Sequence, residues 1–374
     1  MKSTWIKTGA VILLLAALAL RIYLYVMGGL HIPVTTDEAL TVLQALDILN
    51  GDFPLLLAAQ PYMFPVEAYW MAPFVHLLPR DGFGMRALIL FEGLAATMLG
   101  LMVLRRMGGI RATWPGALLI LFPSAYLAMN SAAYSLPHNI SAVIFSLLAA
   151  WCIFGLNRPP AQHDGWLALG GGLFAALAFS NAMISLALVA PLALIAAWSS
   201  IGPGRWRRIP AYTFGAAIGL TPHLLARWLM PGAHESVTAS HAWADALTRW
   251  WSPTLSETLP VTFGWKPVLF PDYSHHIEWG MTGFRAFPFV MTGLIAAAVG
   301  VALIRLLAHW RAGERHDLGA FEWGIGVTLL CCLMFMMTKR ASPSSFRYLL
   351  PVVVVFPYLI TGLWLATPQR VRAV

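Results

Sequence analysis

Two acidic residues, Asp37 and Glu38, stand at the start of a segment with helical spacing, just after the first apolar stretch of the chain. A carboxylate held at the mouth of a cavity can act as a general base toward an acceptor hydroxyl. The same residues also suit a helix cap, because Thr35 and Glu38 have the spacing of a capping box and acids favour the first turn of a helix. The two interpretations are compatible, since a cap can fix the position of a catalytic acid.

Several basic residues are candidate ligands for a phosphate group, because the guanidinium fork of arginine binds phosphate oxygens in pairs. They are Arg86, Lys339, Arg340 and Arg347. Three of them fall in the short segment 339–347, so that segment is strongly basic. Binding of anionic lipid head groups, or snorkelling of long side chains to the membrane surface, remains an alternative explanation for each of these residues.

Histidines and acids also gather in the segment 230–285, where they could bind a metal. They are His234, Glu235, His241, Asp245, Asp272, His275, His276 and Glu278. Their spacing does not match the H-E-x-x-H pattern or another zinc motif, so we expect no dedicated zinc site. A divalent cation assisted by Asp37 and Glu38 remains possible, but no cofactor is required.

The composition identifies the kind of protein that must position these groups. Of the 374 residues, 59% are hydrophobic and 11% are charged, whereas a soluble domain carries about 25% charged residues. This excludes an ordinary soluble enzyme, a disordered chain and a nucleic-acid-binding protein with a charged surface. The apolar residues form blocks of roughly twenty, the length at which a helix crosses a bilayer. We expect an all-α polytopic membrane protein.

About ten transmembrane helices of this length are expected. They lie near 6–27, 84–104, 114–130, 136–156, 165–181, 183–199, 210–229, 286–309, 320–338 and 347–366. Basic residues in the short connections fall on one side if the N-terminus is cytoplasmic, so the positive-inside rule places both termini in the cytoplasm. Two long segments, 28–83 and 230–285, are then extracytoplasmic and hold most of the acids. We expect a single membrane domain, 1–374, in the inner membrane of a bacterium.

The first long segment contains two further apolar stretches. Between Ala39 and Asn50 polar residues recur every three positions, which predicts an amphipathic extracytoplasmic helix lying along the membrane surface. Gly51 and Pro54 are stop signals that end it. A second stretch, 66–78, is expected to return along the same surface.

The residues of this segment resemble the GT-C membrane glycosyltransferases. The resemblance rests on Asp37-Glu38 after the first span, on Leu43 to Pro54, on Gln60-Pro61-Tyr62 and on Glu67-Ala68-Tyr69, and it returns at Phe346 to Pro351. The closest branch contains the protein O-mannosyltransferases and lipid A aminoarabinose transferase. Where family members often carry a Gly-Ser pair, this chain has Phe64-Pro65-Val66, and we expect none of the large soluble C-terminal domain of some relatives.

The resemblance implies a mannosyltransferase-like transfer of a sugar from a polyprenyl-phosphate donor to a hydroxyl on a lipid, glycan or protein acceptor. It implies that Asp37 is the general base, that Glu38 assists it, and that the displacement inverts the anomeric carbon. Arg347 would lie near the donor phosphate. Further residues are expected at the substrate, either from the family segments or from the polar stretch 130–139, which is alternatively a plain cap and turn. They are Gln60, Tyr62, Glu67, Tyr134, His138, Asn139 and Tyr348.

A transporter or lipid flippase is the competing function, and a non-catalytic scaffold is a third. Glu92 lies within the second span, where a charge costs about 2.5–3.5 kcal/mol on insertion scales. It should therefore face the bundle and find a partner, or stay protonated. A transporter would concentrate its acids at this depth, whereas most acids here fall in the two long segments. The expected partners are thus the sugar donor, the acceptor and membrane lipids, and no nucleic acid.

Overall fold

The computed structural model describes residues 2–32, 34–58, 63–79, 81–108, 113–132, 139–156, 163–201, 205–229, 254–255, 258–263, 287–311, 318–337 and 348–367. The regular elements in these ranges are helices. In chain order they are α1 (Lys2–His31), α2 (Thr36–Leu49), α3 (Val66–Leu77), α4 (Gly82–Gly108), α5 (Trp114–Leu121), α6 (Ala125–Asn130), α7 (Asn139–Gly155), α8 (Asp164–Asn181), the short 3₁₀ helix η1 (Met183–Ser185), α9 (Leu186–Ser200), α10 (Arg208–Leu229), α12 (Leu259–Thr262), α13 (Phe287–Arg311), α14 (Ala320–Met337) and α15 (Leu350–Ala366).

The prediction of an all-α membrane protein is confirmed, and the prediction of about ten spans is confirmed in part. Within the described residues, five helices are long and apolar enough to cross a bilayer: Thr8–His31, Gly82–Met107, Met183–Ser200, Pro288–His309 and Ala320–Met337. Two shorter apolar helices, α7 and α15, also coincide with expected spans. The side of the membrane on which each connection lies stays a prediction.

One expected span, 114–130, is broken into α5 and α6. The break falls at Phe122 and Pro123, between the end of α5 and Ser124, whose hydroxyl accepts a hydrogen bond from the Leu127 amide and caps α6. Proline has no amide hydrogen to donate, and it disfavours helical geometry in the residue before it. The apolar composition of this segment therefore concealed a local stop signal.

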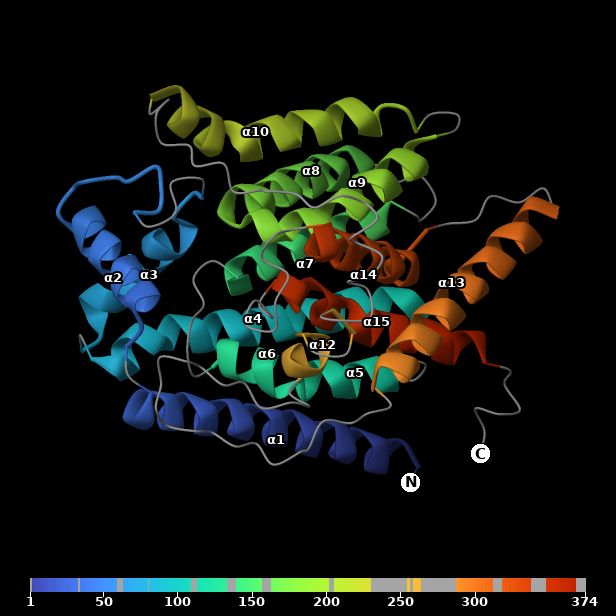
Figure 1. Ribbon diagram of the computed structural model, residues 1–374, viewed down its shortest axis with the longest axis horizontal. Helices are drawn as coiled ribbons and strands as arrows, with labels where there is room; N and C mark the ends of the chain where they lie inside the picture. The colour runs from blue at the N-terminus through green and yellow to red at the C-terminus, as the bar shows by residue number, and fades with distance from the viewer. Residues whose placement is uncertain are drawn as a thin grey trace.

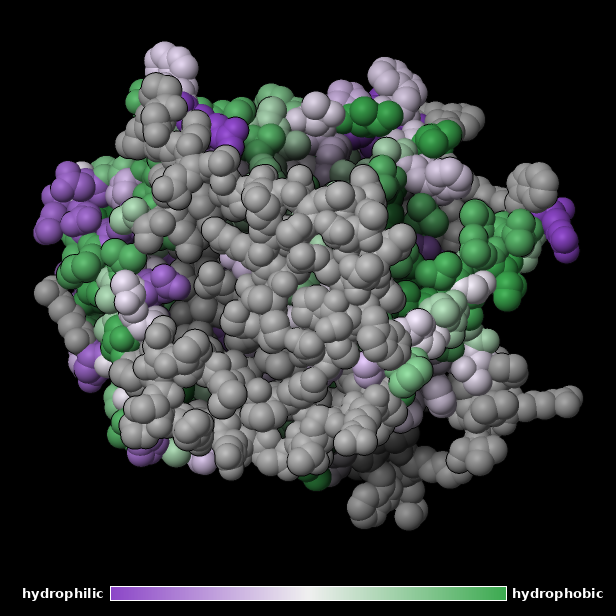
Figure 2. Space-filling model, in the orientation of Figure 1, coloured by the Kyte–Doolittle hydropathy of each residue, from purple (hydrophilic) through white to green (hydrophobic). Residues whose placement is uncertain are grey.

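Helices α1 and α13 lie at the edges of the bundle, with α1 along its lower side and α13 diverging at the right (Figure 1). Most of the apolar length of both helices is exposed. Figure 2 shows the corresponding hydrophobic surface over α13. Leucine, isoleucine and phenylalanine side chains are stable in this position only in contact with lipid or another apolar partner, as expected for an integral membrane protein.

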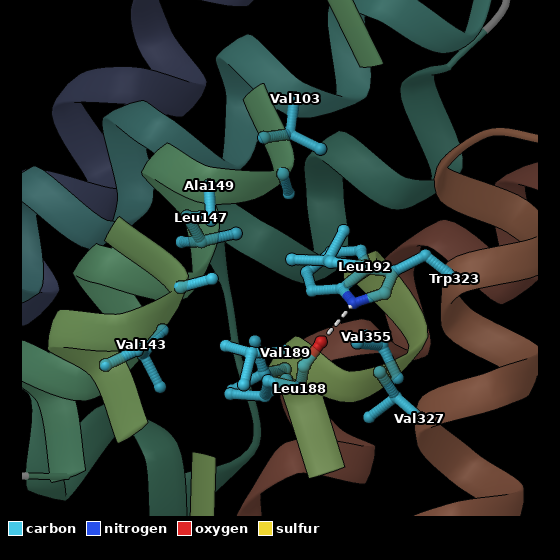
Figure 3. Packing of buried hydrophobic residues seen from close by; sticks show 14 of the residues in the cluster. Val103, Val143, Leu147, Ala149, Leu188, Val189, Leu192, Trp323, Val327 and Val355 are labelled. Carbon is cyan, nitrogen blue, oxygen red and sulfur yellow. Dashed lines mark hydrogen bonds between the residues drawn. The ribbon is translucent and has the colours of Figure 1, made fainter. Parts of the chain in front are cut away.

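The core lies between α4, α7, α9, α14 and α15. Trp323 of α14 is fully buried, and its indole N–H donates a hydrogen bond of 2.8 Å to the Leu188 carbonyl oxygen of α9 (Figure 3). Its ring also packs against Phe154 and Tyr358. A buried indole N–H without a partner would be costly, so this bond fixes α14 against α9.

Helices α8 and α10 approach one another so closely that only glycine fits between them. A Cβ atom at Gly172 would collide with the Tyr212 carbonyl oxygen, and one at Gly215 would collide with the Leu169 carbonyl oxygen. Small residues at such positions are the usual means of close packing between helices in a membrane, where contact replaces the hydrophobic effect as the stabilising force.

Helices α2 and α3 lie together at one end of the bundle, at the left in Figure 1, where α1 ends and α4 begins. Both expected surface stretches are thus helical. The polar stripe of α2 faces the protein: Glu38, Thr41 and Gln44 are buried, while Leu43 and Leu49 are exposed. Three polar side chains of α2 therefore face the rest of the protein, while Asp47 at the end of the stripe is exposed.

Candidate functional site

The N-terminus of α2 is held by the capping box that the sequence predicts. The Thr35 hydroxyl oxygen accepts a hydrogen bond of 3.1 Å from the Glu38 amide, and the Glu38 Oε2 atom accepts one of 2.9 Å from the Thr35 amide. These reciprocal bonds satisfy two amide groups that a helix leaves without internal partners. They fix the backbone of the first turn, on which both acidic residues stand.

Glu38 is also the partner of Arg86, at the start of α4. The Arg86 Nε and Nη2 atoms donate to the two Glu38 carboxylate oxygens at 3.0 and 3.1 Å, in the paired geometry of a strong ion pair. The remaining Nη1 atom donates to the Gly28 carbonyl oxygen and, at 2.9 Å, to that of Ile32. We call Glu38, Arg86 and these two carbonyls the arginine junction, because they join α1, α2 and α4.

The arginine junction is almost fully closed to solvent. The side chains of Arg86 and Glu38 are 1% and 4% exposed. All three guanidinium nitrogens donate to protein atoms, so the structure gives Arg86 a set of partners different from the donor phosphate that we expected. Both carboxylate oxygens of Glu38 are likewise in use, as acceptors from Arg86 and from the Thr35 amide, and its expected part in assisting Asp37 or a metal ion stays a prediction.

Asp37 occupies a different environment from its neighbour. Its side chain is partly exposed, and no hydrogen bond or ion pair joins its carboxylate to any residue that the structure describes. Only its main-chain oxygen has a partner, the Thr41 hydroxyl at 3.1 Å. The capping box and the arginine junction thus fix the backbone beside Asp37, while its carboxylate can still accept a proton from another molecule.

The segment after α2 folds back over α2 and α3. Gly51 has a φ angle of 98°, the left-handed conformation that commonly follows a helix end. The Gln44 side-chain amide donates to the Leu56 carbonyl oxygen, and the Tyr69 hydroxyl to that of Pro54, both at 2.9 Å. Burial raises the pKa of the Tyr69 phenol above its ordinary value, so this hydroxyl keeps its proton for the bond.

Glu67, an expected substrate-binding residue, begins α3 and belongs to a buried polar network. Its Oε1 atom accepts a hydrogen bond of 2.8 Å from the Ser141 hydroxyl of α7, whose oxygen accepts one of 2.7 Å from the Asn181 side-chain amide of α8. The three residues are 3% exposed or less. The network joins α3, α7 and α8, which gives Glu67 a structural part whatever its role toward substrate.

Glu92 lies on α4 near this network and is 2% exposed, so it faces the bundle as expected. Its Oε1 atom has no hydrogen-bond partner among the described residues, and the expectation that the side chain finds a partner or stays protonated stays a prediction.

The other expected site residues are only partly covered by the described ranges. Asn139 is half-buried at the start of α7, and Tyr348 is half-buried before α15, where its carbonyl oxygen accepts a bond from the Cys331 thiol. The rest lie outside the described residues: Gln60, Tyr62, Tyr134, His138, Lys339, Arg340 and Arg347. All eight metal candidates of the segment 230–285 lie outside them as well. Within the described residues, no group of three or more His, Cys, Asp or Glu side chains could hold a metal ion.

Two features of the buried interior were missed in the sequence. Ser141 and Asn181 complete the Glu67 network, but serine and asparagine within helices carry no distinctive pattern. Arg21 is buried in the first span, and here a signal was available, since a charged residue in the middle of an apolar run is rare without a function.

Comparison with known proteins shows a likeness of fold. No family model matches the chain, and no curated protein matches it. Two solved structures are similar, both of ArnT from Cupriavidus metallidurans. The apo structure matches with a TM-score of 0.59 and 14% identity, covering 98% of this chain and 62% of ArnT. The structure bound to undecaprenyl phosphate matches with a TM-score of 0.58 and 14% identity, covering 95% and 60%.

The expected resemblance to GT-C glycosyltransferases is therefore confirmed at the level of the fold, over nearly the whole chain. The chain spans only about three fifths of the length of the ArnT structures that it matches. At 14% identity the likeness extends to the arrangement of helices and does not by itself carry over the activity.

Proposed function

We propose that this protein is a membrane glycosyltransferase of the GT-C type, which transfers a sugar from a polyprenyl-phosphate donor to a hydroxyl group. The observation that carries the proposal is the Asp37 carboxylate, without a described partner beside a rigid capping box and ion pair. The ArnT-like fold supports it, and one of the two similar ArnT structures contains undecaprenyl phosphate.

In this mechanism Asp37 acts on the acceptor. Its carboxylate accepts the proton of the acceptor hydroxyl as the hydroxyl oxygen attacks the anomeric carbon of the donor sugar. The bond between that carbon and the phosphate oxygen breaks, and polyprenyl phosphate leaves as a stabilised anion, so no strong general acid is needed. A single displacement of this kind inverts the configuration at the anomeric carbon.

The rest of the site positions the two substrates. Lys339, Arg340 and Arg347 are the proposed ligands of the donor phosphate. The residues proposed to contact the sugar or acceptor are Gln60, Tyr62, Glu67, Tyr134, His138, Asn139 and Tyr348. Arg86 acts instead as a positioning residue, because its guanidinium nitrogens bond to Glu38 and α1. Holding the first turn of α2 in place preorganises the base, and misplacement of a reacting group by about 1 Å can cost roughly 100-fold in rate.

The proposed site is extracytoplasmic. The distribution of basic residues in short connections favours cytoplasmic termini, which would put the end of the bundle carrying α2 and α3 on the outer side of the bacterial inner membrane. The acceptor would then be a lipid, a glycan or a protein of the cell envelope.

A transporter or lipid flippase is the second candidate, and Glu92 is the observation that favours it. A buried acid without a described partner in a membrane-spanning helix is a common device for coupling proton or ion movement. This function predicts that uptake or lipid translocation depends on Glu92 and continues when Asp37 is changed to asparagine.

Release of polyprenyl phosphate tests the proposal. Purified protein in liposomes is incubated with lipid-linked sugars and acceptor-containing lipid extracted from bacterial envelopes, and undecaprenyl phosphate is quantified by mass spectrometry. We expect Asp37→Asn to lose about 10²–10⁴-fold in rate. Asp47→Asn is the matched control, because Asp47 is exposed on the same helix. Equal rates for wild type and Asp37→Asn would overturn the assignment of the base.

A further inference from the structure

Arg21 lies near the middle of the first candidate span, Thr8–His31, and is only 4% exposed. A guanidinium keeps its positive charge at every pH that proteins experience, and such a charge within a membrane helix needs a compensating partner. Other buried arginines of the chain have one: Arg86 pairs with Glu38, and Arg208 pairs with Asp164.

The partners of Arg21 are neutral. Its Nη1 atom donates to the Ser131 hydroxyl oxygen at 2.9 Å, and its Nη2 atom donates to that of Thr97 at 2.6 Å. Each hydroxyl in turn donates a hydrogen bond to a main-chain carbonyl oxygen: Ser131 to that of Ala128, and Thr97 to that of Gly93. They orient the guanidinium without neutralising it, and no carboxylate of the described residues forms an ion pair with Arg21.

A cavity of about 290 Å³ adjoins Arg21 and is lined by residues of α1, α4, α5, α6, α7 and α15. Most of its wall is hydrocarbon, including Ile120, Leu127, Val143 and Val354. Arg21 is the charged residue among the described residues that line it. Water is held in buried cavities by several polar partners at once and leaves apolar cavities empty, so the apolar part of this space suits a hydrocarbon ligand.

The size and charge of the cavity restrict the ligand further. A space of about 290 Å³ has room for one short hydrocarbon chain. The planar fork of a guanidinium binds a carboxylate and a phosphate alike. One guanidinium balances one negative charge, which is the charge of a carboxylate, whereas a phosphate monoester carries nearly two.

We propose that this cavity binds a single-chain amphiphile with one carboxylate, such as a fatty acid, whose head group pairs with Arg21 and whose chain fills the space among α4, α5, α7 and α15. Arg21 lies deeper in the bundle than Asp37. Arg21 precedes the end of α1 at His31 by ten residues, which at 1.5 Å per residue places it about 15 Å deeper along the helix. The carboxylate supplies the counter-charge that the described chain does not.

Binding of radiolabelled decanoate to the whole protein in nanodiscs, measured by scintillation proximity with unlabelled decanol as the neutral competitor, tests this inference. We expect saturable binding, with decanoate at least about tenfold tighter than decanol, since hydrogen bonds to charged groups are the stronger kind. In Arg21→Gln that preference should vanish. Arg105→Gln, which changes an exposed arginine at the end of α4, should leave the affinity unchanged.

A second variant keeps Arg21 and fills the cavity. Ala96 lines the cavity, so Ala96→Phe should weaken the binding of decanoate and of decanol alike. This variant tests whether the ligand occupies the cavity even if Arg21→Gln does not fold. Equal decanoate affinity in wild type and Arg21→Gln would overturn the role of the charge. Displacement by acetate at the same concentration as decanoate would overturn the role of the chain, and full binding to Ala96→Phe would place the ligand elsewhere.

Discussion

Removal of one partner from the buried ion pair between Glu38 and Arg86 should destabilise the protein strongly. The two side chains are 4% and 1% exposed, so neither charge can be solvated when the other is removed. Loss of one partner from a buried pair costs about 3–5 kcal/mol. Glu38→Gln is the most selective change, because glutamine at this position can still complete the capping box with Thr35.

Thermal unfolding in detergent measures this cost. At about 2 °C per kcal/mol, the lower end of the range for domains of 150–250 residues, we expect Tm to fall by on the order of 6–10 °C. Asp47→Asn, on the exposed face of the same helix, should stay within about 1 °C of wild type. The double variant Glu38→Gln, Arg86→Met should recover part of the loss, because it leaves no uncompensated charge in the interior.

A Tm of Glu38→Gln within about 1 °C of the wild-type value would refute this reasoning. It would mean that the Arg86 guanidinium is compensated by another group, and Arg86 would return to the candidates for the donor phosphate. Recovery in the double variant is a second, independent check, since two unrelated losses would simply add.

Two further substitutions test the packing that surrounds the site. Gly215→Ala should lower Tm because its Cβ atom would meet the backbone of α8, whereas the same change at Gly300 of α13, where nothing lies within 4 Å, should be neutral or stabilising by up to about 1 kcal/mol; equal effects on Tm would contradict the close approach of α8 and α10. Ser141→Ala should cost about 1–3 kcal/mol because its acid and amide partners lose their shared bond. Ser146→Ala on the same helix removes only a hydrogen bond to its own helix backbone and should cost less stability. A larger loss of stability in Ser146→Ala than in Ser141→Ala would contradict the Glu67 network.

The features that the sequence predicted correctly depend on neighbouring residues. The capping box of Thr35 and Glu38 spans one helical turn, and the end of α2 follows from Gly51, so both could be predicted from local spacing. Apolar segments of sufficient length likewise predicted the membrane helices. These patterns need no knowledge of the tertiary structure.

The features that the sequence did not predict depend on residues far apart in the chain. Glu38 and Arg86 are 48 positions apart, and only the meeting of α1, α2 and α4 makes them partners. An arginine at the start of a helix can bind a phosphate or a buried acid equally well, so the residue type alone could not identify the partner of Arg86. The orientation of α2 was undetermined for the same reason, because a polar stripe can face water or a polar interior.

Arg21 and Pro123 carried local signals of their own. A charge in an apolar run and a proline in an expected span are each unfavourable in an uninterrupted helix that faces lipid. In the structure the first adjoins a cavity and the second separates α5 from α6. Departures of this kind from a regular pattern mark the positions where the fold serves something other than spanning the membrane.

The role of Asp37 is tested most directly by separating chemistry from binding. Single-turnover sugar transfer at saturating donor gives the rate of the chemical step, and binding of undecaprenyl phosphate gives the donor affinity. For Asp37→Asn we expect the single-turnover rate to fall by about 10²–10⁴-fold with donor affinity unchanged, and Asp37→Glu should restore part of the rate. A lower donor affinity with an unchanged single-turnover rate would show that Asp37 binds substrate and would contradict its role as the base.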